Sequence, residues 1–374
     1  MKYYKGMDIS TLLEVEKCGG RFFDQGEEKE LLSILKSYDV NAVRIRLWND
    51  PYSEDGKPYG AGTNDFEVAK ELIRRSKEMG FDILLDYHYS DFWADPGKQF
   101  IPKAWRGYTV EELERAVYAY TKETLTQLWK EELLPELVQV GNELSNGLLW
   151  PYGKVPEYDN IARFVNAGIR AVKEVSKEAG KQIRIMIHLD NGGNNALYRE
   201  WFDNFIERGE DFDIIGLSYY PFWHGTFDML ENNMTDIAKR YGKELIIAEV
   251  SMGYSMEDYS EYEKLEAKDR KGMATREELV AKIEFPMTKD GQKAFMEELF
   301  RRLEKIPNNQ ATGYFYWEPA WIPVPGSGWA TEESLAYIED KGPCGNEWAN
   351  QALFDYEGNT LPALQSVRDY CPKK

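Results

Sequence analysis

The amino-acid sequence predicts an α/β fold in which eight parallel strands alternate with helices and close into a (β/α)8, or TIM, barrel. Three observations support this prediction. Eight short apolar runs recur along the chain, amphipathic segments separate them, and long connections follow several of the runs. The 374 residues contain no linker rich in proline, glycine or serine, so we expect a single catalytic domain over residues 1–374.

The predicted strands are short apolar runs, each ending in polar or aromatic residues. In chain order they are Tyr3–Ile9, Ala42–Leu47, Asp82–Tyr87, Leu137–Val140, Ile183–Leu189, Asp213–Tyr219, Leu245–Val250 and Gly313–Trp317. Eight parallel strands are the number that closes this barrel. The alternative, an open doubly wound sheet, would place a glycine-rich turn after the first strand. This chain has Asp8-Ile9-Ser10-Thr11 there instead, which favours the barrel.

Helices are predicted between the strands, where apolar residues recur at helical spacing. The clearest segments are Glu27–Ser37, Phe66–Met79, Val110–Leu133, Asn160–Ala179 and Gly291–Lys305. Long connections follow four of the strands, over Trp48–Asp65, His88–Tyr108, Met252–Lys289 and Glu318–Gln351. The loops that leave the carboxyl ends of barrel strands build the active-site face, so we expect a walled substrate groove there.

Composition narrows the class of ligand. The formal charge of −19 argues against nucleic acid and anionic membrane surfaces as partners, whereas a neutral polymer is not repelled. No apolar run reaches the roughly 20 residues of a membrane helix. Aromatic residues make up 14% of the chain, with 11 Trp and 24 Tyr. A barrel core prefers aliphatic residues, so we expect many rings in loops, where they can stack on sugars. For any single Trp, however, packing in the core is the favoured interpretation.

The cysteines and the N-terminal residues bear on disulfide bonds and on cellular location. Cys18, Cys344 and Cys371 are odd in number and have no metal-ligand spacing, so no disulfide framework is expected. Met1-Lys2-Tyr3-Tyr4 leads directly into the first strand without an apolar leader segment. We expect a cytoplasmic protein if Met1 is native and a secreted one if a leader was removed. The chain is expected to act as a monomer.

Polar residues follow nearly every predicted strand, at the end where the site of this fold lies. They are Asp8, Arg46, His88, Asn142 with Glu143, His188 with Asp190, Tyr219 with Tyr220, Glu249, and Trp317 with Glu318. Burying such groups is costly unless they are paired, so a full ring of them indicates a functional site. His88, His188 and His224 are the three histidines of the chain, and all fall at or just beyond strand ends.

Two other chemistries could in principle use this ring of polar residues. Three histidines with Asp86, Asp91 or Asp190 could bind zinc, but no His-x-His or His-Glu-x-x-His pair is present. Acyl transfer by a serine is disfavoured because no Gly-x-Ser-x-Gly turn occurs. No metal ligand is therefore assigned.

A pair of carboxylates fits better. Glu143 follows the fourth predicted strand and Glu249 closes the seventh, on opposite sides of a narrow barrel mouth. Retaining glycosidases need two carboxyl groups about 5–5.5 Å apart, one protonated and one ionised. Asn142 could bind the sugar 2-hydroxyl, and Tyr219 and Arg46 could hold the nucleophile ionised. Either glutamate alone could equally be an ion pair at a strand end.

Several segments resemble glycoside hydrolase family 53, the endo-β-1,4-galactanases, over nearly the whole chain. The matching blocks are Lys5-Gly6-Met7-Asp8-Ile9-Ser10, residues 43–51, residues 86–99 with Asp95-Pro96-Gly97-Lys98-Gln99, Gly141-Asn142-Glu143, residues 215–221, Ala248-Glu249-Val250 and residues 350–355. The resemblance implies a barrel with Glu143 as acid/base and Glu249 as nucleophile.

The resemblance also assigns supporting residues and a substrate. Arg46, His88, Asn142 and Tyr219 would support the catalytic subsite, with Trp317 as its floor. Weaker substrate contacts would be Asp8, Asp91, Trp93, His188, Asp190 and Trp329. The reaction implied is endo-hydrolysis of β-1,4-galactan, as in pectin side chains or type I arabinogalactan, with anomeric retention and no organic cofactor.

Some alternatives remain open. The catalytic pair alone does not separate galactan from β-mannan, xylan or β-glucan, and a carbohydrate-binding barrel without chemistry is a rival from another class. Some bacterial relatives in this family bind calcium between the seventh and eighth loops. The corresponding stretch here, Glu257-Asp258-Tyr259-Ser260-Glu261-Tyr262, lacks a clear Asp-x-Asp-Gly run, which argues against calcium.

Overall fold

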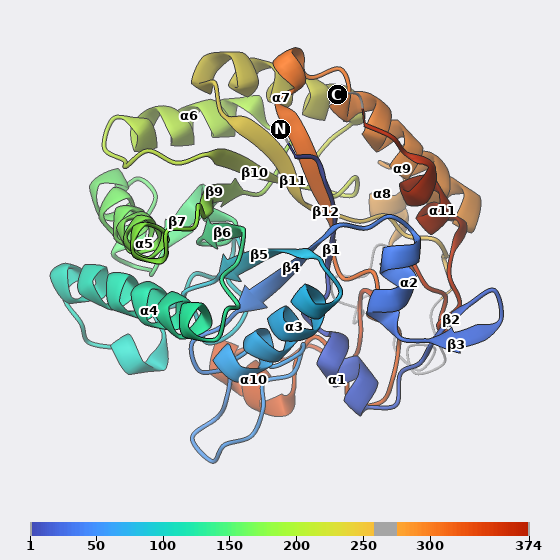
Figure 1. The fold of residues 1–374 in the computed structure, drawn as a ribbon, viewed down its shortest axis with the longest axis horizontal. Coiled ribbons are helices and arrows are strands. Elements are labelled where there is room, and N and C mark those ends of the chain that lie inside the picture. Colours follow the sequence, from blue (N-terminus) through green and yellow to red (C-terminus); the bar gives the residue numbers. More distant parts are fainter. Residues whose placement is uncertain (1, 258–274, 373–374) are drawn as a thin grey trace.

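The computed structural model describes residues 2–257 and 275–372. Within these residues, eight parallel strands close into a barrel in the order β1-β12-β11-β10-β9-β6-β5-β4 (Figure 1). The barrel strands are β1 (Tyr4–Asp8), β4 (Ala42–Leu47), β5 (Asp82–Tyr87), β6 (Leu137–Val140), β9 (Arg184–Leu189), β10 (Ile214–Tyr219), β11 (Glu244–Val250) and β12 (Ala311–Tyr316). The predicted (β/α)8 barrel is thereby confirmed, and every predicted strand end falls within two residues of the observed end.

Helices surround the barrel on its outer side (Figure 1). They are α1 (Leu12–Lys17), α2 (Leu31–Ser37), α3 (Phe66–Glu78), α4 (Val110–Lys130), α5 (Tyr158–Ala179), α6 (Asn195–Ile206), α7 (Phe227–Tyr241), α8 (Glu277–Val280), α9 (Lys289–Leu303), α10 (Glu332–Ile338) and α11 (Pro362–Asp369). Local signals set several starts: Asp65 caps α3 by accepting from the Val68 amide, and Thr109 with Glu112 forms a capping box on α4. In the described part of the chain, none of these helices has the length and apolarity needed to cross a membrane.

One predicted helix begins later than expected. Residues 27–29 of the predicted helix Glu27–Ser37 form β3 (Glu27–Lys29), which pairs antiparallel with β2 (Phe22–Asp24), and α2 begins only at Leu31. Glu27 and Glu28 are exposed charged residues, so a helix over them would have no apolar face to bury. The hairpin instead gives Lys29 an ion pair with Asp24, with Nζ and Oδ2 2.9 Å apart.

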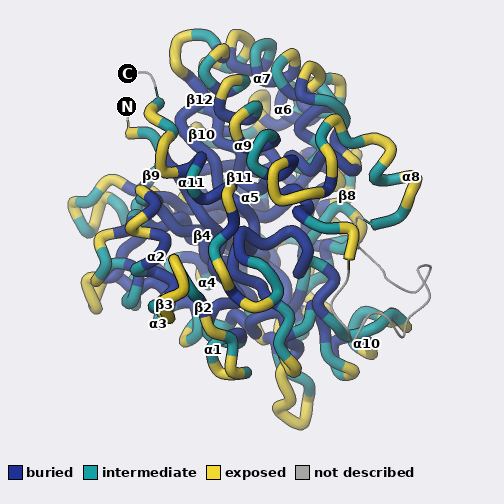
Figure 2. The backbone as a smooth tube through the Cα atoms, turned by 90° about the vertical axis from the view of Figure 1, so that its right-hand side faces the viewer, coloured by how far each residue is buried: buried dark blue, intermediate teal, exposed yellow. Residues whose placement is uncertain are grey.

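The barrel interior changes from apolar to polar along its axis. Its lower part is a buried apolar cluster formed by Tyr4, Ala42, Leu84, Leu137, Met186, Ile214, Ile246, Ala248 and Phe315. A larger apolar core lies between strands and helices, and Figure 2 shows buried residues concentrated in the middle of the molecule. Two residues further along several strands, the inward positions are polar: Arg44, Asp86, Gln139 and His188. Side chains alternate along a strand, so this polar layer meets the carboxyl ends, where the site lies.

Candidate active site

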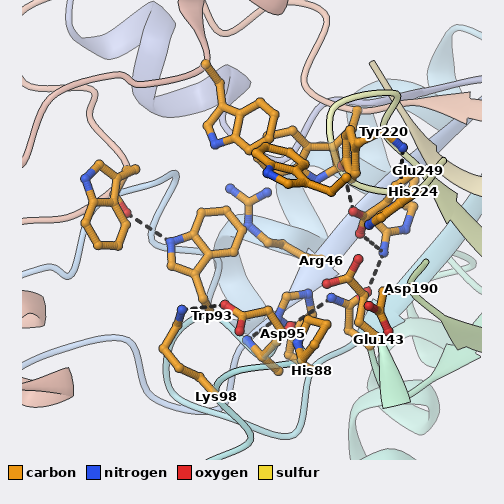
Figure 3. A pocket seen from close by; sticks show the side chains of 18 of the residues that line it. Arg46, His88, Trp93, Asp95, Lys98, Glu143, Asp190, Tyr220, His224 and Glu249 are labelled. Atoms are coloured by element: carbon orange, nitrogen blue, oxygen red, sulfur yellow. Dashed lines mark hydrogen bonds and ion pairs between the residues drawn. The ribbon is translucent and has the colours of Figure 1, made fainter. Parts of the chain in front are cut away.

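A cleft of about 260 Å³ opens at the carboxyl ends of the barrel strands (Figure 3). Its walls come from strand ends and from the loops that follow them. They comprise Arg44, Arg46, His88, Trp93, Ala94, Asp95, Pro96, Lys98, Asn142, Glu143, Asp190, Tyr220, Trp223, His224, Glu249, Trp317, Trp329, Glu347 and Trp348. Five tryptophans and one tyrosine among acidic, basic and amide groups make a surface suited to a sugar polymer.

Glu143 and Glu249 meet in this cleft. Glu143 follows β6 in a left-handed backbone conformation, with φ 49° and ψ 56°. The register of β11 shifts against both neighbours beside Ala248, and this bulge turns Glu249 toward the barrel interior. A carboxylate oxygen of one glutamate lies within 4.8 Å of one on the other, and the residues are only 8% and 6% exposed. This closeness matches the separation of about 5–5.5 Å in retaining glycosidases, not the wider inverting one.

Both oxygens of Glu249 are held by donors. Oε1 lies 2.9 Å from Nη2 of Arg44, and the Tyr220 hydroxyl donates to Oε2 at 2.8 Å. Burial raises the pKa of Glu249, but the Arg44 cation and the Tyr220 hydrogen bond act against that rise. These two partners favour the ionised carboxylate, as a nucleophile requires.

Arg44 is itself fixed by a network of buried groups. Nη1 contacts Asp8 and Nη2 contacts Asp86, each at 2.8 Å, and Nε donates to the side-chain oxygen of Gln139 at 3.2 Å. Every edge of the planar guanidinium thus has an acceptor. The position of the cation beside Glu249 is therefore set before any substrate arrives.

Glu143 has a different environment. The Ser218 hydroxyl donates to its Oε1 at 2.6 Å, and His188 Nε2 lies 2.9 Å behind that hydroxyl. Burial raises the pKa of Glu143 well above its usual range, and the negative charges of Glu249 and Asp190 raise it further. Glu143 is thus the member of the pair that retains a proton. Within the described residues Oε2 makes no hydrogen bond, so this oxygen is the one available to a ligand.

Two predicted supports of the nucleophile are wrong. Arg46 does not contact Glu249; Nη1 pairs with Glu318 at 2.6 Å, and the guanidinium lies 4.4 Å from the Trp93 ring centroid, in the cleft wall. Tyr219 points out of the barrel, where it stacks on Phe295 and its hydroxyl donates to a backbone carbonyl. Side chains alternate along β10, so the inward neighbour of Glu249 is the next residue in the chain, Tyr220.

The other predicted substrate contacts divide into two groups. His88, Trp93, Asn142, Asp190, Trp317 and Trp329 line the cleft together with Arg46. Asp8, Asp91 and His188 are fully buried and do not line it. Asp8 pairs with Arg44; Asp91 accepts from the backbone amides of residues 50 and 103; and His188 lies behind Ser218. These three residues support the site from beneath rather than contacting a ligand.

Sequence reasoning missed several groups of the site. Arg44 and Ser218 lie two residues before Arg46 and Tyr220, so they share the inward face of the same strands. Strict alternation, applied to each strand, would have found both of them. Trp223 and Trp348 also line the cleft, but they come from loops that give no such periodic signal.

A potential metal cluster coincides with the carboxylate pair. Among the described residues, Glu143, His188 and Glu249 each offer one ligand atom, all within 4.8 Å of one another. However, both ring nitrogens of His188 already contact polar side chains, Ser218 on one side and Asn142 on the other, each at 2.9 Å. Both oxygens of Glu249 also have partners, one of which is cationic, so these groups do not fit a divalent ion.

Residues 257–262, whose sequence argues against a calcium site, lie almost wholly outside the described residues, which stop at Glu257 and resume at residue 275.

Comparison with known proteins agrees with this geometry. The model of glycosyl hydrolase family 53 matches residues 4–367. An endo-beta-1,4-galactanase of Bacillus subtilis (strain 168) is 34% identical over 397 aligned residues, covering 100% of this chain and 88% of the relative. An arabinogalactan endo-beta-1,4-galactanase of Cellvibrio japonicus (strain Ueda107) is 33% identical, covering 97% and 89%. The solved family 53 catalytic domain of Ignisphaera aggregans superposes with a TM-score of 0.88 at 37% identity, covering 98% of this chain and 96% of that one.

Proposed function

Because this chain belongs to glycosyl hydrolase family 53, and is thus a glycoside hydrolase, we propose that it cleaves internal β-1,4 bonds of galactan with retention at the anomeric carbon. The observation that carries the mechanism is the pair formed by Glu143 and Glu249. Their carboxylate oxygens lie within 4.8 Å of each other, and only Glu249 has a cation against it. One group is thus equipped to give a proton and the other to attack.

In the first step, the carboxylate of Glu249 attacks the anomeric carbon of a bound galactose unit. The bond from that carbon to the glycosidic oxygen breaks, and the proton on Glu143 passes to this leaving oxygen. Arg44 and Tyr220 orient the attacking carboxylate, and Ser218 anchors the far oxygen of the acid. The product is a glycosyl ester on Glu249 and a shortened galactan chain.

In the second step, Glu143 is ionised and acts as a base. It takes a proton from a water molecule, whose oxygen attacks the anomeric carbon and displaces Glu249. The ester breaks, the galactose end is released with its original anomeric configuration, and both glutamates return to their starting protonation states. Among the described residues, the candidate metal ligands of this site are already engaged by Ser218, Arg44 and Tyr220, so the two proposed steps use no metal.

Asn142 lies beside the pair and is positioned to contact the sugar. Its amide nitrogen donates to the backbone oxygen of Ala94 at 2.8 Å, and its oxygen accepts from Arg44 at 2.9 Å. Trp317 and Trp93, with ring centroids 6.0 Å apart, form adjoining faces of the same cleft. Stacking of sugar rings on these faces, without charge complementarity, suits a neutral polymer.

Digestion of linear β-1,4-galactan tests this proposal directly. We expect rapid release of oligosaccharides of several lengths, and proton NMR during the first turnovers should show the β-anomer before mutarotation. First-formed α-anomer would overturn the retaining mechanism. A panel of β-mannan, xylan and β-glucan tests the substrate, and a kcat/KM on any of them above that on galactan would overturn the assignment.

A further inference from the structure

A second groove borders the catalytic cleft on the same face of the barrel. Its volume is about 520 Å³, within the range of ligand sites, and we call it the Trp150 groove. It is lined by Phe100, Ile101, Arg106, Gly107, Trp150, Pro151, Tyr152, Tyr337, Ile338 and Glu339. These residues belong to the loops that follow the barrel strands β5, β6 and β12, which are the loops that also build the cleft.

The two hollows share one wall. Lys98 lines the catalytic cleft and Phe100 lines the Trp150 groove, so these two wall residues lie at most about 7 Å apart along the backbone. The residue between them, Gln99, is buried, and its side chain donates to the backbone oxygen of Asn142 at 2.8 Å. The groove therefore borders the segment that carries Glu143.

The aromatic walls of the groove are held in place. The amide of Trp150 donates to the backbone oxygen of Gln99 at 2.7 Å, and its indole nitrogen donates to the backbone of Asn146 at 2.9 Å. Tyr337 stacks on Tyr59 with centroids 5.2 Å apart. Rigid aromatic surfaces bind ligands at a low cost in conformational entropy.

The groove also matches a neutral, hydroxyl-rich ligand in charge. Arg106 and Glu339 are both exposed on its rim and carry opposite charges. Tyr152 is 39% exposed, and Trp150 is partly exposed, so both rings are accessible. Lys154 Nζ also lies 4.3 Å from the Trp150 ring centroid. Aromatic faces beside polar groups of both charges are the chemistry that recognises sugar rings.

We propose that the Trp150 groove binds further galactose units of the same β-1,4-galactan chain, beyond the end of the cleft that Lys98 lines. This inference rests on the proposed function, and it adds a polymer-binding site that short substrates cannot reach. It follows that the groove raises the rate on long chains without taking part in bond cleavage.

The test compares long and short substrates. Trp150→Ala and Tyr152→Ala each remove one ring; Tyr152 is exposed, so its variant keeps the test valid if the Trp150 variant does not fold. We expect kcat/KM on long linear galactan to fall about 2- to 10-fold, because each variant loses one ring on which a sugar stacks. The rate on an aryl β-galactobioside, which does not extend into the groove, should stay unchanged. In native gels that contain galactan, each groove variant should also be retarded less than the unmodified chain.

Trp129→Ala is the matched control, because Trp129 lies on α4 outside both hollows. Its side chain is 37% exposed, a fraction similar to the 39% of Tyr152. Its rates on both substrates should equal those of the unmodified chain. The inference is overturned if the groove variants keep their rate on long galactan, or lose equally on the short substrate. If the unmodified chain releases no products from galactan, the proposed function itself fails, which is a distinguishable result.

Discussion

The hydroxyl of Tyr220 donates to Oε2 of Glu249 at 2.8 Å, on the oxygen opposite to the one that Arg44 contacts. The neighbouring hydroxyl of Tyr219 instead donates to the backbone of Gly225 on the outside of the barrel. Two consecutive tyrosines thus serve different purposes, one in the reaction and one in packing.

This difference predicts the effect of removing each hydroxyl. Tyr220→Phe should lower kcat about 10–100-fold, because a hydrogen bond to a charged group contributes about 1.5–3 kcal/mol. The Tyr220 hydrogen bond lowers the pKa of Glu249, so its loss raises that pKa and moves the acidic limb of the kcat/KM profile to higher pH. Tyr219→Phe should leave both kcat and this limb unchanged. Equal losses in the two variants would contradict the assignment.

The roles of the two glutamates predict different responses to an added nucleophile. Glu249→Ala and Glu143→Ala should each lose orders of magnitude in kcat on galactan while remaining folded. With an activated aryl galactoside and azide, the Glu143 variant should yield a β-galactosyl azide, because the ester on Glu249 still forms. The Glu249 variant should yield the α-azide, by direct displacement. Product NMR distinguishes them, and the reverse pattern would exchange the two roles.

The hydrogen bond from Ser218 to Glu143 predicts a change in pH dependence. This bond lowers the pKa of Glu143, so Ser218→Ala should raise that pKa and shift the alkaline limb of kcat/KM to higher pH. We also expect kcat to fall about tenfold, because Oε1 is no longer anchored. Ser218→Thr retains a hydroxyl and should restore the original limb. A purely structural role for Ser218 would leave the limb in place in both variants.

Removal of the Asp190 charge should shift the alkaline limb of kcat/KM in the direction opposite to that expected for Ser218→Ala. Burial raises the pKa of Asp190 to about 6, and above that pH its negative charge raises the pKa of Glu143. Asp190→Asn removes this charge, so the pKa of Glu143 should fall and the alkaline limb should move to lower pH. The shift is measured from the pH dependence of kcat/KM on an aryl galactobioside. An alkaline limb that stays in place would show that Asp190 does not act through Glu143.

Much of the fold was predictable because a barrel strand is an apolar run of fixed length. Ala42–Leu47 and Asp82–Tyr87 were predicted with their observed bounds. The predicted helix start at residue 27 was wrong because residues 27–29 are all charged. Without apolar residues among them, no periodicity distinguishes a strand from a helix. Glu143 and Glu249 were found because both stand at strand ends of the active-site face.

The partners of these glutamates were harder to predict, for two physical reasons. A one-residue error in phase exchanges the inward and outward faces of a strand, and this is why Tyr219 was chosen instead of Tyr220. Alternation places Arg44 on the same inward face as Arg46, but the reach of its long side chain from one layer deeper to Glu249 depends on tertiary packing. Trp223 and Trp348 lie on irregular loops, whose paths depend on tertiary packing.

The backbone of Glu143, at φ 49° and ψ 56°, affects the thermal stability of the enzyme. A residue with a Cβ in this region costs of order 1 kcal/mol or more, whereas glycine adopts it freely. Glu143→Gly should therefore melt at a higher temperature than Glu143→Ala, by an amount equivalent to about 1 kcal/mol. The barrel thus holds its proton donor on a strained backbone, and part of its thermal stability is given up at the position on which the reaction depends.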